Sequence, residues 1–286
     1  MVAKKDTWKK FPHADAAYQY AGAALKKNWA RLHLGDAETY PDEAGLKALV
    51  KANPGLADSA GDLKSAATAL QEAWRLFHAG ELQKAHDAGL EIGPLGYTVA
   101  NKSASIYGNY LETADTKKLA LFEEITARCE ELQQAAPKWA NAWYFHAYAL
   151  GRYSQGISVV KALAQGLGGK IKDSLTRAIK LEGRHADAHI AFGTYHAEII
   201  DKVGGLLGGA TYGASKDEGV KHFKQALKLN PDSAIARVEY ANGLVMMYGK
   251  SRLAEAGALY EEAAQCEPLD AMERLDVELA KAELEE

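Results

Sequence analysis

Apolar residues recur at helical spacing along almost the whole chain. The clearest case is the stretch 219–249. Its first half places Val220, Phe223 and Ala226 on one face of a helix. Pro231 ends that helix and begins a second one, because proline disfavours a helical residue before it and fits a first helical turn. The pattern predicts a helical hairpin with small residues where the two helices approach each other.

The same hairpin recurs along the sequence. Residues that end helices stand 37 to 48 positions apart, and these markers are Pro12, Pro54, Pro94, Pro137, Gly183, Pro231 and Pro268. A small residue stands ten positions after three of these markers, and a large residue stands eight positions before three of them. The small set is Ala147, Gly193 and Ala241, and the large set is Leu175, Phe223 and Tyr260. Self-similarity at such a period is typical of solenoid proteins, so we expect an all-α superhelix of about six helix hairpins.

The pattern divides the chain into three parts. Residues 1–59 predict an N-terminal helical segment, a divergent repeat that either completes the solenoid or folds back onto it. Residues 60–268 predict the repeats. Residues 269–286 predict a C-terminal capping helix, which begins with the capping-box pattern Asp270-x-x-Glu273.

The small and large positions resemble the tetratricopeptide repeat (TPR). In this sequence Ala256, Tyr260, Ala263 and Pro268 match the pattern of the family's second helix. The resemblance covers most of residues 60–270. It departs in length, since the family repeat has 34 residues and the units here are longer. The resemblance implies a non-enzymatic scaffold that binds a protein or peptide partner.

Two narrower groups are also similar. The helices Trp143–Leu150 and Ala188–Glu198 resemble those of the regulator-of-microtubule-dynamics family. Alanine-rich first helices followed by long inserts resemble the T component of repeat-containing TRAP transporters in the bacterial periplasm. The second resemblance implies the alternative function, a transporter-accessory or small-ligand-binding protein.

In the TPR family, four positions of each first helix face the concave groove. Those positions hold Asn141, Tyr144, Tyr148 and Gly151 in one unit, Asp187, Ile190, Thr194 and Ala197 in the next, and Ile235, Val238, Asn242 and Val245 in a third. Tyrosine and asparagine side chains suit peptide recognition. We therefore expect a partner to bind at Asn141, Tyr144, Tyr148, Asp187, Thr194 and Asn242, with both tyrosines accessible. The alternative is a groove filled by a neighbouring helix or by a second copy of the chain in a homo-oligomer.

Two glycine-rich, apolar inserts interrupt the repeats at 154–169 and 202–214. Equivalent loops of a solenoid emerge on the same edge, so the inserts are expected to be neighbours. They either form flexible turns with a short helix on the scaffold or build a binding rim. The small-ligand alternative requires an enclosed apolar pocket near Leu206, Leu207, Tyr212 and residues 159–167.

Charge and hydropathy exclude several function classes. A net charge of −4 and a pI near 6.2 argue against a nucleic-acid partner. No stretch approaches the roughly 20 apolar residues of a transmembrane segment. The N-terminus lacks a signal-peptide pattern, which makes the cytoplasm the expected compartment, or the periplasm if a leader has been removed. Cys129 and Cys266 are far apart and are expected to be free thiols.

Histidines are the strongest candidates for chemistry. His185, His189 and His196 lie on one predicted helix, where an i, i+4 pair is able to bind a metal ion. However, His189 and His196 fall at positions that pack between helices, and His185 is expected to be solvated at the helix start. Residues 243–251 nearly match a phosphate loop but have the wrong glycine spacing and no preceding strand. We therefore expect no catalytic residue, metal or cofactor.

Overall fold

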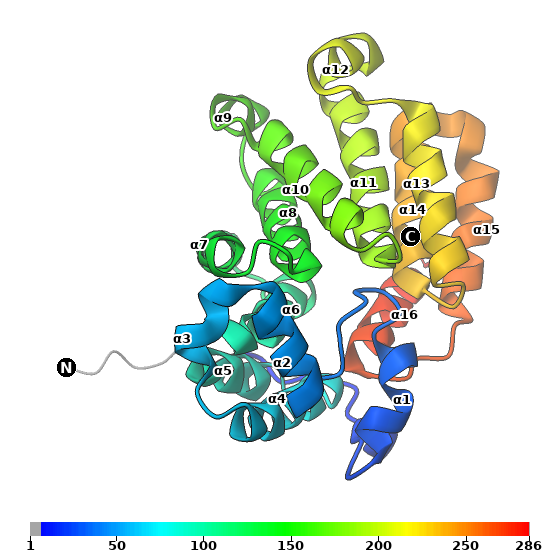
Figure 1. Cartoon of the computed structure of the whole chain (residues 1–286). Coiled ribbons are helices and arrows are strands. Elements are labelled where there is room, and N and C mark those ends of the chain that lie inside the picture. Colours follow the sequence, from blue (N-terminus) through cyan, green and yellow to red (C-terminus); the bar gives the residue numbers. More distant parts are fainter. Residues whose placement is uncertain (1–6, 286) are drawn as a thin grey trace.

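The computed structural model describes residues 7–285, and helices connected by turns make up most of this part of the chain (Figure 1). The α-helices are α1 (Ala24–Leu32), α2 (Glu43–Ala52), α3 (Ala57–Ala60), α4 (Leu63–His78), α5 (Leu82–Ile92), α6 (Tyr97–Ile106), α7 (Asp115–Ala135), α8 (Ala140–Gln155), α9 (Val159–Ala164), α10 (Leu167–Leu181), α11 (Ala186–Val203), α12 (Gly205–Tyr212), α13 (Lys216–Leu229), α14 (Ala234–Tyr248), α15 (Leu253–Ala264) and α16 (Ala271–Glu283). Residues 7–285 contain no strand, which confirms the predicted all-α class.

Consecutive helices pack in pairs, and the pairs stack. The pairs are α4 with α5, α6 with α7, α8 with α10, α11 with α13, and α14 with α15. The first helices also contact one another in series, from α4 through α6, α8 and α11 to α14. This is the predicted superhelix of helix hairpins, with the first helices as its inner row (Figure 1).

Two segments differ from regular repeat helices. In the N-terminal segment, the short 3₁₀ turn Ala16–Tyr18 is separate from α1, because Gly22 adopts a positive φ of 56° between them. The glycine-rich inserts each carry a short helix, α9 in the first and α12 in the second. Both helices extend to the same end of the molecule in Figure 1.

Small residues determine how closely the helices approach. The Phe223 ring of α13 is fully buried between α11 and α14. A Cβ atom at Gly193 of α11 would lie 2.7 Å from this ring, and one at Gly243 of α14 would lie 2.6 Å from it. The two glycines therefore make the space that Phe223 fills, and the contact with Gly193 explains the small and the large position of this repeat.

The two ends of the superhelix meet. Helix α16 packs on α14 and α15 and also contacts α4. The Tyr20 hydroxyl donates to the Leu269 carbonyl at 2.7 Å, and His78 Nδ1 lies 2.7 Å from Asp270 Oδ2, with the His78 and Asp270 side chains both buried. Arg31 of α1 forms an ion pair with Glu273 at 2.7 Å. Figure 1 shows α16 beside α1 as a result.

The small-to-large packing gives a matched pair of substitutions within helices. We expect Gly193→Ala to lower the free energy of unfolding by about 1–3 kcal/mol, since the new methyl group overlaps the buried Phe223 ring. Gly257→Ala in α15 meets no atom within 4 Å and should raise it by about 0.5–1 kcal/mol through helix propensity. Urea unfolding of both variants measures the difference. Equal shifts in the same direction would contradict the packing described.

Candidate functional site

The N-terminal segment crosses the concave side of the superhelix. The carbonyl of Gly35 accepts a hydrogen bond from the backbone N–H of Asp187 at the start of α11, at 2.9 Å. Asp36, which is 1% exposed, lies 2.6 Å from Lys102 Nζ on α6 and 2.8 Å from His33 Nδ1. The segment 33–38 therefore folds back onto the inner row of helices.

Asn141 connects this segment to two helices. Its amide nitrogen donates to Glu38 Oε2 at 2.7 Å and to the Asp36 carbonyl at 3.1 Å. Its Oδ1 lies 2.9 Å from His185 Nε2. His185 Nδ1 accepts from the backbone N–H of Ala188, so the proton is on Nε2, and burial lowers the pKa of His185 to about 4. The expectation that His185 is solvated is wrong, because this histidine is fully buried as the N-cap of α11.

Two carboxyl groups in this region bind their protons tightly. Burial and the nearby negative charge of Asp36 raise the pKa of Glu38 to about 8. Burial also raises the pKa of Asp187 to about 7, although Lys102 opposes the change. Burial by itself would raise the pKa of Asp36 as well, but the contact with His33 and the charge of Lys102 hold it below its ordinary value. The network around the segment 33–38 therefore contains one ionised carboxylate, Asp36, and two carboxyl groups that titrate near neutral pH, Glu38 and Asp187.

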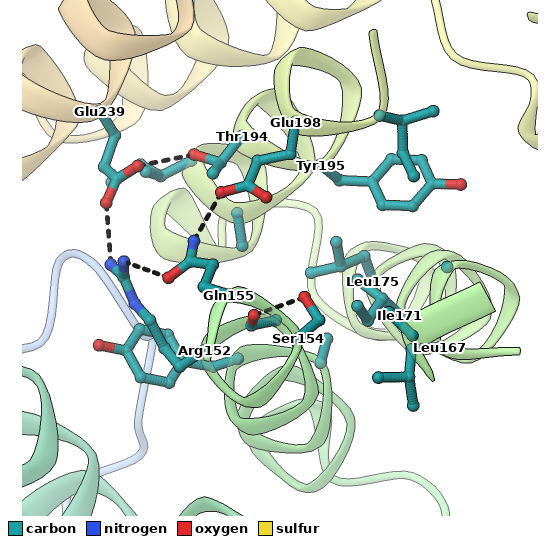
Figure 2. A pocket seen from close by; sticks show the side chains of 18 of the residues that line it. Arg152, Ser154, Gln155, Leu167, Ile171, Leu175, Thr194, Tyr195, Glu198 and Glu239 are labelled. Carbon is teal, nitrogen blue, oxygen red and sulfur yellow. Dashed lines mark hydrogen bonds and ion pairs between the residues drawn. The ribbon is translucent and has the colours of Figure 1, made fainter. Parts of the chain in front are cut away.

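Beside this network the concave side opens into a pocket of about 180 Å³, bordered by α8, α9, α10, α11, α12, α14 and α16. One wall is polar. Arg152 of α8 forms an ion pair with Glu239 of α14 at 2.8 Å, and Glu239 also accepts from the Thr194 hydroxyl at 3.0 Å. Gln155 Nε2 donates to Glu198 Oε1 at 2.7 Å. Figure 2 shows these side chains in a row across one side of the pocket.

The opposite wall is apolar. Leu167, Ile171 and Leu175 of α10 face the pocket together with Tyr195 of α11 (Figure 2). Val159 and Leu163 of α9 and Tyr212 of α12 continue this wall, so both glycine-rich inserts contribute to it. The second insert also contacts the helix that follows the first, since Lys172 Nζ of α10 donates to the Tyr212 carbonyl at 2.9 Å. The pocket therefore offers hydrogen-bonding groups on one side and an aliphatic surface on the other.

The structure brings five of the predicted site residues together. Tyr144, Tyr148, Asp187, Thr194 and Tyr212 all line the pocket. Tyr148 is partly buried, but Tyr144 is only 7% exposed, and its ring packs 4.5 Å from that of His185. The expectation of two accessible tyrosines on an open groove is therefore wrong for Tyr144.

The other four predicted residues lie outside the pocket. Asn141 is covered by the segment 33–38, and Asn242 accepts a hydrogen bond from the Tyr260 hydroxyl between α14 and α15. Leu206 and Leu207 were expected in the wall of a ligand pocket, but their side chains are 93% and 59% exposed on α12. Glycine-rich α12 turns these two leucines outward while Tyr212 reaches the pocket.

Two of the most important pocket residues were missed in the sequence. Arg152 follows Tyr148 by four positions, and Glu198 follows Thr194 by four, so each extends the concave stripe of its helix by one turn. Continuing the i, i+4 series beyond the twelfth position of the repeat would have found both. Glu239 lies on α14 one position after Val238 and offers no comparable signal.

The described residues provide no obvious metal centre. Across residues 7–285, no group of three or more His, Cys, Asp or Glu side chains is arranged to hold a metal ion. His189 instead pairs with His222 of α13, with 2.8 Å between their Nδ1 atoms, while His185 points to Asn141. None of the helices within residues 7–285 is long and apolar enough to cross a membrane.

Comparison with known proteins supports the fold. No protein-family model matches the chain, and no curated protein matches it. Among solved structures, the chain is similar to a thermophilic TPR protein of Thermus thermophilus, with a TM-score of 0.53 and 19% identity over 76% of this chain and 99% of that chain. At this identity the likeness shows a TPR-like helical repeat fold alone. The comparisons do not show the narrower resemblances to the TRAP T component or to the regulator-of-microtubule-dynamics family.

Glu38 gives stability a specific pH dependence. A carboxyl group whose pKa is raised in the folded state contributes stability below its ordinary pKa and loses it as the pH rises through the folded value. The pKa values of His33 and His185 are lowered to about 4, so these two histidines make the free energy of unfolding rise with pH. They do so only below about pH 6.5, the ordinary pKa of histidine. From pH 6.5 to pH 8 we therefore expect the free energy of unfolding to fall. Glu38 contributes on the order of 1 kcal/mol to this change, and the raised pKa values of Asp187 and Asp276 add slopes of the same sign.

Chemical denaturation across this pH range tests the assignment. Glu38→Gln keeps an acceptor for Asn141 but cannot ionise, so its stability should fall less steeply with pH, while the contributions of Asp187 and Asp276 remain. Glu261→Gln, at an exposed position of α15, is the control and should retain the wild-type slope. A slope unchanged by Glu38→Gln would show that Glu38 is not the group responsible.

Proposed function

We propose that this protein is a non-enzymatic binding protein that receives the apolar part of its partner in the pocket between α8, α10 and α11. One observation carries the proposal. On the concave side the chain covers its own inner helices with the segment 33–38 and with α16, yet it leaves open a pocket that Val159, Leu163 and Ile171 border on the side opposite Arg152. Pockets with an apolar lining and a few convergent polar groups are typical ligand sites.

A small amphipathic molecule is the occupant that we favour. An extended peptide along the groove would meet the segment 33–38, which already occupies Asn141 and the start of α11. A small molecule needs only the space that remains, with its apolar part on α10 and its polar end near Arg152 and Gln155. Both charged pairs of the polar wall are internally compensated, Arg152 by Glu239 and Lys202 by Glu198, which favours a polar or weakly charged end.

A protein or peptide partner is the second candidate. The TPR-like fold supports it, since stacked helix pairs of this kind commonly present concave surfaces to protein partners. Such a partner would insert one apolar side chain into the pocket and rest its remaining surface on the rim. A homo-oligomer formed in this way is a special case of the same arrangement.

Substitution of Gly151 tests whether the pocket is the binding site. Gly151 lines the pocket, and a Cβ atom there meets nothing within 4 Å, so the side chain of Gly151→Leu starts in open space and takes up part of the pocket. We expect the wild-type protein to enhance the fluorescence of the uncharged probe N-phenyl-1-naphthylamine and 1-decanol to displace this probe. Gly151→Leu should weaken binding of the probe about tenfold, as filling part of a small apolar site does.

Gly169→Leu is the matched control. Gly169 is exposed on α10 and has open space around it, so the same substitution there should leave probe binding unchanged. Equal binding by both variants, or no binding by the wild-type protein, would refute the small-molecule proposal. Peptides selected on the wild-type protein from a display library and rejected by Gly151→Leu would instead support the second candidate.

A further inference from the structure

The outer edge formed by the two inserts exposes aliphatic side chains to an unusual degree. We define the insert rim as residues 154–172 and 202–216, which include α9 and α12. Leu206 is 93% exposed, Val160 76%, Leu207 59% and Leu163 45%. Exposed leucines and valines scattered singly need no explanation, but four on two adjoining inserts at one end of the molecule form a candidate interaction surface (Figure 1).

The rim also differs in charge from the rest of the chain. It contains five lysines, Lys161, Lys170, Lys172, Lys202 and Lys216, and no aspartate or glutamate. Four acidic residues lie within two positions of its bounds, Asp173, Asp201, Asp217 and Glu218, so the five lysines and these four residues together carry a net charge of +1 (5 − 4), against −4 for the whole chain. Among these lysines, Lys202 is paired with a carboxylate, that of Glu198 on the adjoining turn of α11. The rim therefore combines projecting aliphatic groups with a small local excess of positive charge.

We propose that the insert rim docks on an anionic lipid surface. Aliphatic side chains that project from short helices enter the region between lipid head groups and acyl chains, and nearby lysines are attracted to anionic head groups. This inference does not rest on the occupant of the pocket. It also agrees with the geometry of α12, which holds Leu206 and Leu207 outward on a backbone with few side chains of its own.

The composition of the rim favours lipid over protein. Protein interfaces are enriched in aromatic residues, methionine and arginine, and leucine and valine are under-represented among their energetic centres. Within residues 154–172 and 202–216 there is no methionine or arginine, and the one aromatic residue, Tyr212, is partly buried against the pocket. A protein partner would therefore find few of the anchors that protein interfaces normally use.

Vesicle flotation of the full chain tests the proposal. We expect the wild-type protein to float with vesicles of phosphatidylcholine and phosphatidylglycerol and to float less with phosphatidylcholine alone. The triple variant Val160→Ser, Leu206→Ser, Leu207→Ser should bind the anionic vesicles about tenfold less, because it removes the groups that enter the bilayer. All three residues are exposed, so their substitution leaves the packed scaffold unchanged.

The matched control carries serine at exposed leucines elsewhere. Leu253 and Leu284 are 50% and 45% exposed, outside the rim, and the double variant Leu253→Ser, Leu284→Ser should float like the wild-type protein. Circular dichroism confirms that each variant retains its helices. A wild-type protein that does not float, or a triple variant that floats equally well, would overturn the proposal. So would sedimentation showing that the rim residues drive self-association and not vesicle binding.

Discussion

The buried contact between Asp36 and Lys102 determines how the concave side is built. Lys102 is 4% exposed on an inner helix, and an ammonium group buried there without a partner would be strongly destabilising. Asp36 supplies the opposite charge at 2.6 Å, which requires the segment 33–38 to cross the inner row. Once that segment is in place, Gly35 meets Asp187 and Glu38 meets Asn141. As a consequence, the concave side is partly covered and holds a pocket, and it does not form a continuous open groove.

The helix hairpins could be predicted from the sequence, but the contacts that close the superhelix could not. The hairpins were predictable because small residues, such as Gly193, and large residues, such as Phe223, recur at fixed distances from the residues that end helices. The closing contacts join residues with no periodic relation, such as Tyr20 with Leu269 and His78 with Asp270. Their partners are 249 and 192 positions apart along the chain, so only the accumulated curvature of the stacked pairs brings them together.

The same reasoning explains the mixed outcome for the candidate site. Positions on the inner helices were predicted to face the concave side, and Tyr144, Tyr148, Asp187 and Thr194 do line the pocket there. Repeat arithmetic places a residue on a face of its helix but does not show what covers that face. Asn141 has the expected direction and is nevertheless occupied by the chain itself. The accessibility of Tyr144 and the solvation of His185 failed as predictions for this reason.

The inserts link the two surfaces that we assign to binding. Val159 and Leu163 of α9 line the pocket and are also 38% and 45% exposed, so each side chain belongs to the pocket wall and to the insert rim. A surface that covers the rim would remove solvent from the outer side of the same residues that an apolar ligand contacts from within. Binding at the two places is then coupled, and coupling between equilibria is reciprocal. An occupied pocket would change the affinity of the rim for a lipid surface by the same factor as the lipid surface changes the affinity of the pocket for its ligand.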